Sequence, residues 1–144
     1  MPARFAPAKR GATARDIVLT QADVRSVQLG KAALRAGIEI LLKESGVAQL
    51  DRIYLAGTFG NHLDPNDILH IGMVPPVAVE RIHSIGNAAG DGARMALFNR
   101  HHRRRAAKIA RDMRVIELTM RSEFQDLFVG CTALTPGAVQ PLPA

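Results

Sequence analysis

Two short apolar segments of this sequence each run directly into a turn of small residues, and each turn opens a helical pattern. The segment Arg52–Ala56 leads into Gly57–Asn61, and the segment Arg81–Ile85 leads into Gly86–Gly90. Strands that alternate with helices are typical of α/β domains with a parallel sheet. The turns that follow such strands lie at the carboxyl edge of the sheet, where open α/β sheets bind ligands. We therefore expect an α/β fold with its functional residues in these two turns.

Capping and apolar patterns predict the other elements. Thr20, with Asp23 three residues on, predicts the start of a helix from Gln21 to about Glu44, and Gly46 is a natural stop. The buried stripe of this helix is expected at Val24, Val27, Leu34, Ile38, Leu41 and Leu42. The further elements expected are a strand at Asp16–Leu19, a helix from Pro65 to about Gly72, a helix from the second turn through Phe98, a polar helix at about Asn99–Arg111, a strand at Arg114–Leu118 and a helix at about Arg121–Val129.

Residues 16–130 are expected to form the folded part of the chain. Residues 1–15 contain four basic residues, no acidic residue and no apolar period, which indicates a flexible tail or, alternatively, an organellar transit peptide. Residues 131–144 are rich in proline and are expected to form a second tail. No apolar run approaches the roughly 20 residues of a membrane span. The absence of a secretory segment near Met1 favours the cytoplasm.

The single cysteine, Cys131, limits the cofactors that this chain can hold. Iron–sulfur clusters and thiolate zinc sites take about four ligands, so we expect neither within this chain. Cys131 itself is expected to be a small apolar residue, since no basic cluster beside it would favour a thiolate. No metal site is expected from the histidines, which lack ligand spacing and are interpreted as solvated side chains and helix caps: His62, His70, His83, His101 and His102.

The net charge of +6 is concentrated in the segment Arg100–Arg114, which has seven basic residues and one acidic residue. Three interpretations are open. The segment is a solvated helix, a docking patch for an acidic protein, or a nucleic-acid binding surface. The last is the least favoured because no aromatic residue lies in the segment to stack on bases. A solvated helix would bury a stripe made of Ala106, Ala107, Ile109, Ala110 and Met113.

The composition of the two turns suits close contact with a ligand. Glycine tolerates positive φ and, without a side chain, lets the backbone lie against a flat group such as a purine ring. Exposed N–H groups at the start of the helix after Gly86–Gly90 could face an anion. Neither turn has the Walker phosphate-loop pattern or the GxGxxG order of a dinucleotide fingerprint. The turns are therefore either a ligand cradle or simple tight connections between strand and helix.

A wider resemblance is carried by four segments: DIVLTQADVRSVQLGKAALRAGIEILL (Asp16–Leu42), IYLAGTFGNHLDPNDILHIGMVPP (Ile53–Pro76), IGNAAGDGARMAL (Ile85–Leu97) and FQDLFV (Phe124–Val129). In order and spacing they resemble the C-terminal part of the reductive activators of corrinoid proteins. The resemblance implies part of an actin-like ATPase module of the ASKHA superfamily, which includes acetate kinase, Hsp70 and actin and has a ribonuclease H-like fold. In the activators this module follows an N-terminal ferredoxin-type iron–sulfur domain.

The same resemblance assigns roles to the two turns. Gly57–Asn61 corresponds to the adenosine motif, and Gly86–Gly90 corresponds to the second connecting segment at the interdomain hinge. The implied ATP-binding residues are Gly57, Thr58, Phe59, Gly60, Asn61, Gly86, Asn87, Ala88, Ala89 and Gly90. The family pattern has a second glycine where this chain has Thr58. A β-branched residue resists positive φ, so we expect backbone strain at Thr58 and weaker nucleotide binding.

The function that the resemblance implies is ATP-dependent return of a corrinoid protein, or of a corrinoid-dependent methyltransferase, from Co(II) to Co(I). The electron would come from a cluster carried elsewhere, for example on a separate activator chain with the ferredoxin domain. Superfamily members hold the phosphates with two hairpins, and nothing upstream of Gln21 is expected to form one. We therefore expect no catalytic residue and no ATP hydrolysis by this chain alone. The alternative is a non-catalytic interaction module that has kept the fold and lost nucleotide binding; a homo-oligomer is compatible with both.

Overall fold

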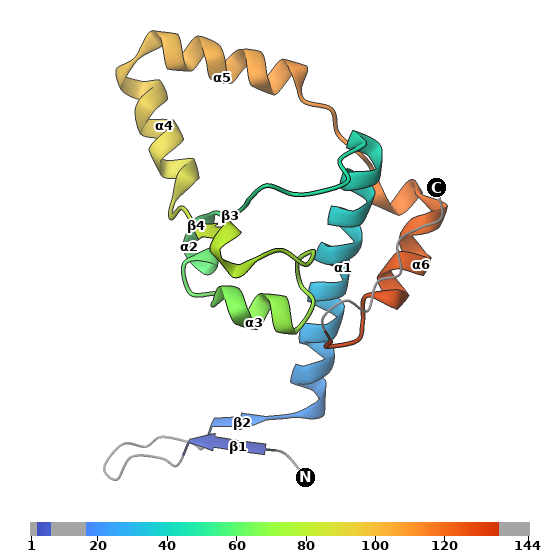
Figure 1. Cartoon of the computed structure of the whole chain (residues 1–144). Helices are drawn as coiled ribbons and strands as arrows, with labels where there is room; N and C mark the ends of the chain where they lie inside the picture. Colours follow the sequence, from blue (N-terminus) through green and yellow to red (C-terminus); the bar gives the residue numbers. More distant parts are fainter. Residues whose placement is uncertain (1–2, 7–16, 136–144) are drawn as a thin grey trace, which may run out of the picture.

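The computed structural model describes residues 3–6 and 17–135, and Figure 1 shows how the elements follow one another. The elements are β1 (Ala3–Ala6), β2 (Ile17–Leu19), α1 (Gln21–Ser45), β3 (Ile53–Leu55), α2 (Gly57–Gly60), α3 (Pro65–His70), β4 (Ile82–Ser84), α4 (Ala88–Phe98), α5 (Arg100–Asp112) and α6 (Ser122–Gly130). Two short 3₁₀ turns cover Val79–Arg81 and Leu118–Met120. The mixed α/β class predicted from the sequence is confirmed.

The longest element, α1, begins and ends as predicted. The Thr20 hydroxyl oxygen accepts a hydrogen bond from the Asp23 backbone N–H at 3.2 Å, and the Thr20 N–H donates to the Asp23 carboxylate at 2.8 Å. The Thr20 hydroxyl also donates to the Asp23 carboxylate at 2.6 Å, and this bond, followed by that of the Thr20 N–H, lowers the pKa of Asp23. At the other end, Gly46 closes the helix in the left-handed conformation at φ 65°.

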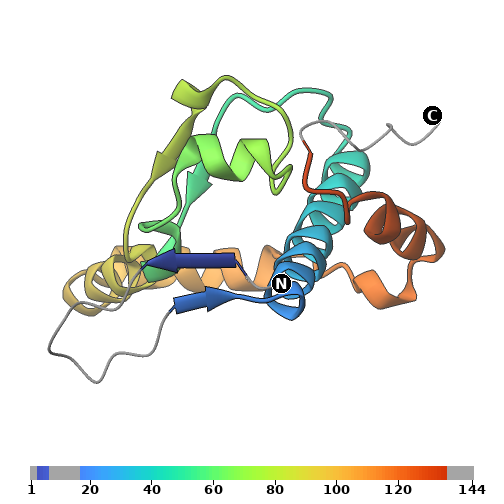
Figure 2. The same ribbon diagram turned by 90° about the horizontal axis from the view of Figure 1, so that it is seen from below.

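The buried face of α1 is not the predicted one. Val27, Leu34 and Leu41, which belong to the expected stripe, are exposed by 48%, 50% and 53%. The residues buried instead are Lys31, Ala32, Arg35, Ala36, Gly37 and Ile40. Small side chains on this face let neighbours approach closely. A Cβ added to Gly37 would lie 3.2 Å from Cδ1 of Leu118, and α6 runs beside α1 in both views (Figures 1 and 2).

Two small hydrophobic clusters form the core, and α1 contributes to both. The first joins α1 to α6 through Ala36, Ile40 and Leu127, with Phe124 and Phe128 among the side chains packed against them. The second joins α3 to β4: it consists of Ile68, Val74 and Ile82, and the partly buried side chains against it include Ile38, Ile53 and Leu55. The strand pair β3–β4 is therefore held against α1 by apolar contacts.

β3 and β4 pair in parallel, with Ile53 opposite Ile82 and Leu55 opposite Ser84. A second pair, β1 and β2, is antiparallel, with Ala3 opposite Leu19. A strand pair thus forms upstream of Gln21, whereas the expectation that no phosphate-holding hairpin precedes Gln21 stays a prediction. The β-branched segment of β2 favours an extended backbone, whose N–H and C=O groups need a partner strand. The expected tail at residues 1–15 lies outside the described residues except for β1, as does the end of the chain from residue 136.

The strand expected at Arg114–Leu118 is not formed. The segment is extended, with Glu117 at φ −80° and ψ 104°, but no described strand pairs with it. Its side chains Ile116 and Leu118 pack instead on the cluster between α1 and α6. The sheet β3–β4 lies across α1 from that cluster (Figure 1), so no strand edge is within reach.

The buried stripe expected on the polar helix is also wrong. No residue of α5 is buried, and Ile109 and Met113 are exposed by 53% and 64%. The principal neighbour of α5 is α4, the helix directly before it. The two helices form an arch that stands away from α1 and the strand pair and returns to them at both ends (Figure 1), so no buried face forms on α5.

Two cations are buried in α1. The side chains of Lys31 and Arg35 are exposed by only 3% and 4%. Nη1 of Arg35 donates to the Val74 carbonyl at 2.6 Å, and its Nε donates to a Glu39 carboxylate oxygen at 2.6 Å. Nζ of Lys31 donates to the Ala133 carbonyl at 2.5 Å. Backbone carbonyls from two different segments thus receive hydrogen bonds from α1.

Replacing Arg35 with Met should lower the free energy of unfolding by about 2–3 kcal/mol, because the Val74 carbonyl and the Glu39 carboxylate would lose a buried charged donor. Urea denaturation followed by circular dichroism measures this. Arg25→Met is the matched control, since Arg25 is exposed on the same helix, and its effect should stay within about 0.5 kcal/mol. Equal losses in the two variants would show that the buried hydrogen bonds do not stabilise the fold.

Candidate functional site

The two glycine turns lie side by side. Because β3 and β4 are parallel neighbours, both turns leave the sheet at the same edge, as the sequence predicted. The Gly57 N–H donates to the Gly86 carbonyl at 2.7 Å, and the Ile85 N–H donates to the Leu55 carbonyl at 3.0 Å. The ladder of the sheet therefore continues into the turns and holds Gly57–Asn61 against Gly86–Gly90.

Glycine is required by the backbone at the first position of each turn. Gly57 has φ 91° and Gly86 has φ 67°, values that residues with a Cβ rarely adopt. Gly60 is needed for a different reason: an added Cβ would lie 3.2 Å from the carbonyl carbon of Leu55. Around Gly57, by contrast, nothing lies within 4 Å of an added Cβ. The first turn therefore packs closely against β3 at Gly60 and leaves free space beside Gly57.

Polar side chains tie the turns together. The Ser84 hydroxyl donates to Oδ1 of Asn61 at 2.5 Å, which links the end of β4 to the first turn. Oδ1 of Asn87 accepts the Gly90 N–H at 3.0 Å and so caps α4. A Cβ at Gly90 would lie 2.5 Å from Nδ2 of Asn87, so glycine makes room for this cap. Ser84 was not among the expected site residues; its place as the last residue of the strand before the second turn was the available signal.

Thr58 does not have the expected strain. It lies in the short helix α2, and no non-glycine residue among those described has positive φ. The left-handed position of this turn is taken by Gly57 instead. The expectation that Thr58 pays a backbone cost is therefore wrong. Thr58 and Phe59 are both exposed, the Phe59 ring by 73%.

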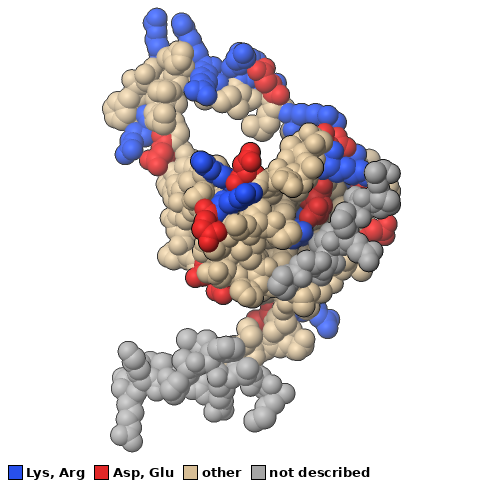
Figure 3. All heavy atoms as spheres, viewed as in Figure 1, with Lys and Arg blue, Asp and Glu red and all other residues tan. Residues whose placement is uncertain are grey.

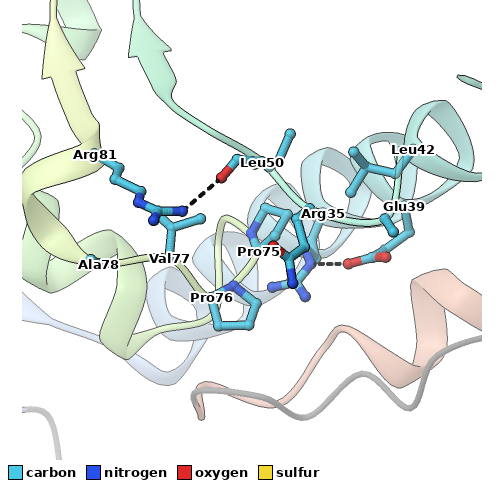
Figure 4. A pocket seen from close by; sticks show the side chains of 11 residues that line it. Arg35, Glu39, Leu42, Leu50, Pro75, Pro76, Val77, Ala78 and Arg81 are labelled. Carbon is cyan, nitrogen blue, oxygen red and sulfur yellow. Dashed lines mark hydrogen bonds and ion pairs between the residues drawn. The ribbon is translucent and has the colours of Figure 1, made fainter. Parts of the chain in front are cut away.

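A groove of about 740 Å³ lies at the opposite edge of the strand pair, where β3 and β4 begin. Arg35 and Glu39 of α1 form one wall, Pro75 and Pro76 another, and Arg81 reaches across to donate to the Leu50 carbonyl at 3.3 Å (Figure 4). No motif or pattern in the sequence indicated this groove. Its charged groups are already engaged with each other or with backbone carbonyls. They contribute to the fold rather than to a ligand site.

The remaining candidate residues lie apart from the turns and from each other. Cys131 is fully buried, as expected of a small apolar residue, and burial raises the pKa of its thiol despite the nearby cations Arg35 and Lys31. His70 caps its own helix by a contact of 2.7 Å with the Asn66 carbonyl, and the ring of His83 packs beside Tyr54. Among the described residues, no three His, Cys, Asp or Glu side chains come together in a way that could hold a metal ion.

In the part of the chain that the structure describes, no helix has the length and apolar character to cross a membrane.

Comparison with known proteins agrees with this geometry. The family described as the C-terminal domain of RACo, the ASKHA domain, matches residues 2–144. The chain is 36% identical over 117 residues to the corrinoid activation enzyme RamQ of Eubacterium limosum, which covers 80% of this chain and 20% of the relative. The solved structure of a reductive activator for corrinoid, iron-sulfur protein is similar with a TM-score of 0.76 and 34% identity, over 83% of this chain and 19% of that one.

This chain therefore spans about a fifth of the length of these two relatives. The similarity extends from the sequence to the three-dimensional arrangement of its strands and helices, and the family match runs over nearly every residue. The chain belongs to the family of C-terminal ASKHA domains of RACo.

Proposed function

We propose that this chain forms the C-terminal part of the ATPase module of a corrinoid reductive activator and takes part in returning a corrinoid protein from Co(II) to Co(I). Two relatives support this, since one is named a corrinoid activation enzyme and the other a reductive activator for a corrinoid, iron-sulfur protein. The observation that carries the proposal is the contact between the two turns, at 2.7 Å from Gly57 N to Gly86 O, which brings together the two segments that resemble the adenosine motif and the second connecting segment.

The residues of the turns fit the base and ribose of ATP. The open space at Gly57 lets a flat ring approach the backbone, and the exposed Phe59 ring offers a surface for stacking. The Asn61 amide and the Ser84 hydroxyl supply polar groups at the same place. None of the ten turn residues is charged, so they supply no cation for the phosphates. The phosphate groups would be held by other residues of the module.

In this proposal ATP binding and turnover change the affinity of the activator for the corrinoid protein and so make an unfavourable electron transfer possible. The residues of this chain position the nucleotide and do not take part in ATP hydrolysis or electron transfer. Gly57–Asn61 receives the base, and Gly86–Gly90 connects the strand pair to α4. The electron comes from an iron–sulfur cluster outside this chain, because Cys131 is its single cysteine.

A second candidate function is an interaction module that keeps this fold without binding nucleotide. It is favoured by the absence of charge in the two turns and by the concentration of cations in α5. The first experiment below separates the two candidates.

Calorimetric titration of the full chain with ATP and ADP should detect binding, and Gly57→Ala should raise the Kd by at least about tenfold, since the new methyl group occupies the space proposed for the base. Gly46→Ala is the matched control. Gly46 also has a left-handed backbone, at φ 65° with nothing within 4 Å, but it ends α1 outside both turns. Both variants should lose about 1–2 kcal/mol of stability, whereas only Gly57→Ala should weaken binding. Equal Kd values for parent and both variants, or no binding by the parent, would favour the interaction module.

Thr58→Gly tests the corrected view of this turn. Because Thr58 is helical, glycine relieves no strain there, and we expect the Kd for ATP to stay within about twofold of the parent, with up to about 1 kcal/mol lost in stability. The same titration and a urea denaturation measure both. A Kd that falls by tenfold or more would mean that the Thr58 side chain obstructs the base.

The activation itself can be followed from the absorption spectrum of a purified corrinoid protein. With a chemical reductant and ATP, a ferredoxin-bearing activator fragment should convert Co(II) to Co(I) only when this chain is added, because each part lacks groups that the other supplies. The chain alone should neither hydrolyse ATP nor reduce cobalt. Conversion by the fragment at the same rate without this chain would count against the proposed function, whatever the nucleotide titration gives.

A further inference from the structure

The side-chain amide of Asn61 is held in one orientation where the two turns meet. The Ser84 hydroxyl donates to its Oδ1 at 2.5 Å, so the amide nitrogen, Nδ2, points away from Ser84. Nδ2 lies beside Gly86, at 3.9 Å from the position that a Cβ on that glycine would take. The carbonyl of Gly86 in turn accepts the Gly57 N–H at 2.7 Å. The last residue of β4 therefore sets the direction in which the Asn61 amide donates.

Nδ2 of Asn61 donates no hydrogen bond to another residue in the described part of the chain, where the one bond of this amide is the one that Oδ1 accepts. The amide of Asn66 differs, because its Nδ2 donates to Oδ1 of Asp64 at 3.1 Å. Since Asn61 is exposed, water satisfies its free donor until a ligand arrives. A ligand at the two turns would thus meet a donor whose direction is already fixed, which lowers the entropy cost of binding.

A donor of fixed direction selects among the groups of a nucleotide. A ribose hydroxyl both donates and accepts, so it could bind an asparagine amide in either orientation. Fixing the amide through Ser84 matters only for a group that accepts a hydrogen bond without donating one. In ATP the principal groups of this kind are the phosphate oxygens and the unprotonated ring nitrogens of adenine. The contact between Ser84 and Asn61 therefore points to one of these two kinds of acceptor.

Charge distinguishes the phosphate oxygens from the ring nitrogens. Lys and Arg side chains crowd along α5 in the space-filling view (Figure 3), whereas none of the ten residues of the two turns is charged. Phosphates are bound mainly by cations or by free N–H groups at a helix start, and at the start of α4 the Asn87 side chain already accepts the Gly90 N–H. The ring nitrogens are neutral, and the exposed Phe59 ring offers the base a surface for stacking. An uncharged donor at this place fits the base.

We propose that Nδ2 of Asn61 donates a hydrogen bond to a ring nitrogen of adenine, and that Ser84 is the positioning residue that holds the amide for this bond. The inference rests on the proposed function, because it requires that the two turns receive the base. Ser84 acts through Asn61 and needs no contact of its own with the nucleotide. An adenine analogue with a C–H group in place of the accepting nitrogen would leave the donor without a partner.

Calorimetric titration of the full chain with ATP and with its 1-deaza, 3-deaza and 7-deaza analogues identifies the accepting nitrogen. One analogue should bind the parent about threefold to tenfold more weakly than ATP does. Asn61→Leu, which keeps the size of the side chain and adds no charge, should weaken ATP binding by a similar factor and should bind that analogue as well as ATP. Asn66→Leu is the matched control. It removes an exposed amide outside both turns, and the Kd for ATP should stay within about twofold of the parent.

Two variants of Ser84 test its role as the positioning residue. Ser84→Thr and Ser84→Val place side chains of equal size at the end of β4 and differ only in the hydroxyl. Ser84→Thr should keep the Kd for ATP within about twofold, whereas Ser84→Val should raise it by about threefold or more, because the amide must then be ordered on binding. Nuclear Overhauser contacts from the Asn61 amide hydrogens to Hα of Gly86 give a measurement without nucleotide. They should be present in the parent and in Ser84→Thr and weaker in Ser84→Val.

The outcomes separate this inference from the proposed function. If ATP binds the parent and Asn61→Leu equally well, or if the parent binds all three analogues as tightly as ATP, the inference is wrong and the proposed function still stands. No binding of ATP by the parent would overturn both. Equal Kd values and equal Overhauser contacts for Ser84→Thr and Ser84→Val would overturn the role of Ser84, whatever Asn61 contributes.

Discussion

The buried guanidinium of Arg35 is the contact on which the arrangement of this chain depends. It lies on the face of α1 that packs against both hydrophobic clusters, and its bond to the Val74 carbonyl fixes the loop that leads to β4. One turn earlier, Lys31 holds the Ala133 carbonyl after α6, at the cost of desolvation that lowers the pKa of its ammonium group. A buried cation is tolerated only with such partners, so these two residues define where the neighbouring segments must lie.

The candidate site inherits its geometry from this arrangement. Two parallel strands of three residues each would not be stable alone. Ile53, Leu55 and Ile82 hold them on the second cluster, and the hydrogen bond from Gly57 to Gly86 then places the two turns together. At Gly60, where the turn meets the strand, an added Cβ would contact the backbone of Leu55. At Gly57, where a ligand could approach, nothing lies within 4 Å of an added Cβ. Rigid support and local openness are both needed for a site built from backbone.

What the sequence predicted well was local: the cap at Thr20, the stop at Gly46, and the two strands with their turns. Each depends on residues a few positions apart. The errors concern contacts over long distances. The buried face of α1 is built around the small residues Ala32, Ala36 and Gly37, which let neighbouring segments approach closely, and Leu34 and Leu41 remain exposed. The extended segment after α5 lacked a neighbouring strand, and Thr58 lacked the positive φ that a glycine-based pattern had implied. The first two errors do not depend on local propensity, whereas the error at Thr58 is local, because the preceding residue Gly57 takes the left-handed position.

The glycine turns and the basic helix are connected through a single element. Asn87 caps the start of α4 directly after Gly86, and Asn99, which ends α4, caps α5 by accepting the His101 N–H at 2.8 Å. No residue of α4 or α5 is buried, so neither helix is fixed by the two clusters. With 11 residues, α4 is about 16 Å long, so a rotation at its first residue displaces its other end. The direction in which the backbone leaves Gly86 therefore sets where α4, and with it α5, lies relative to the two turns.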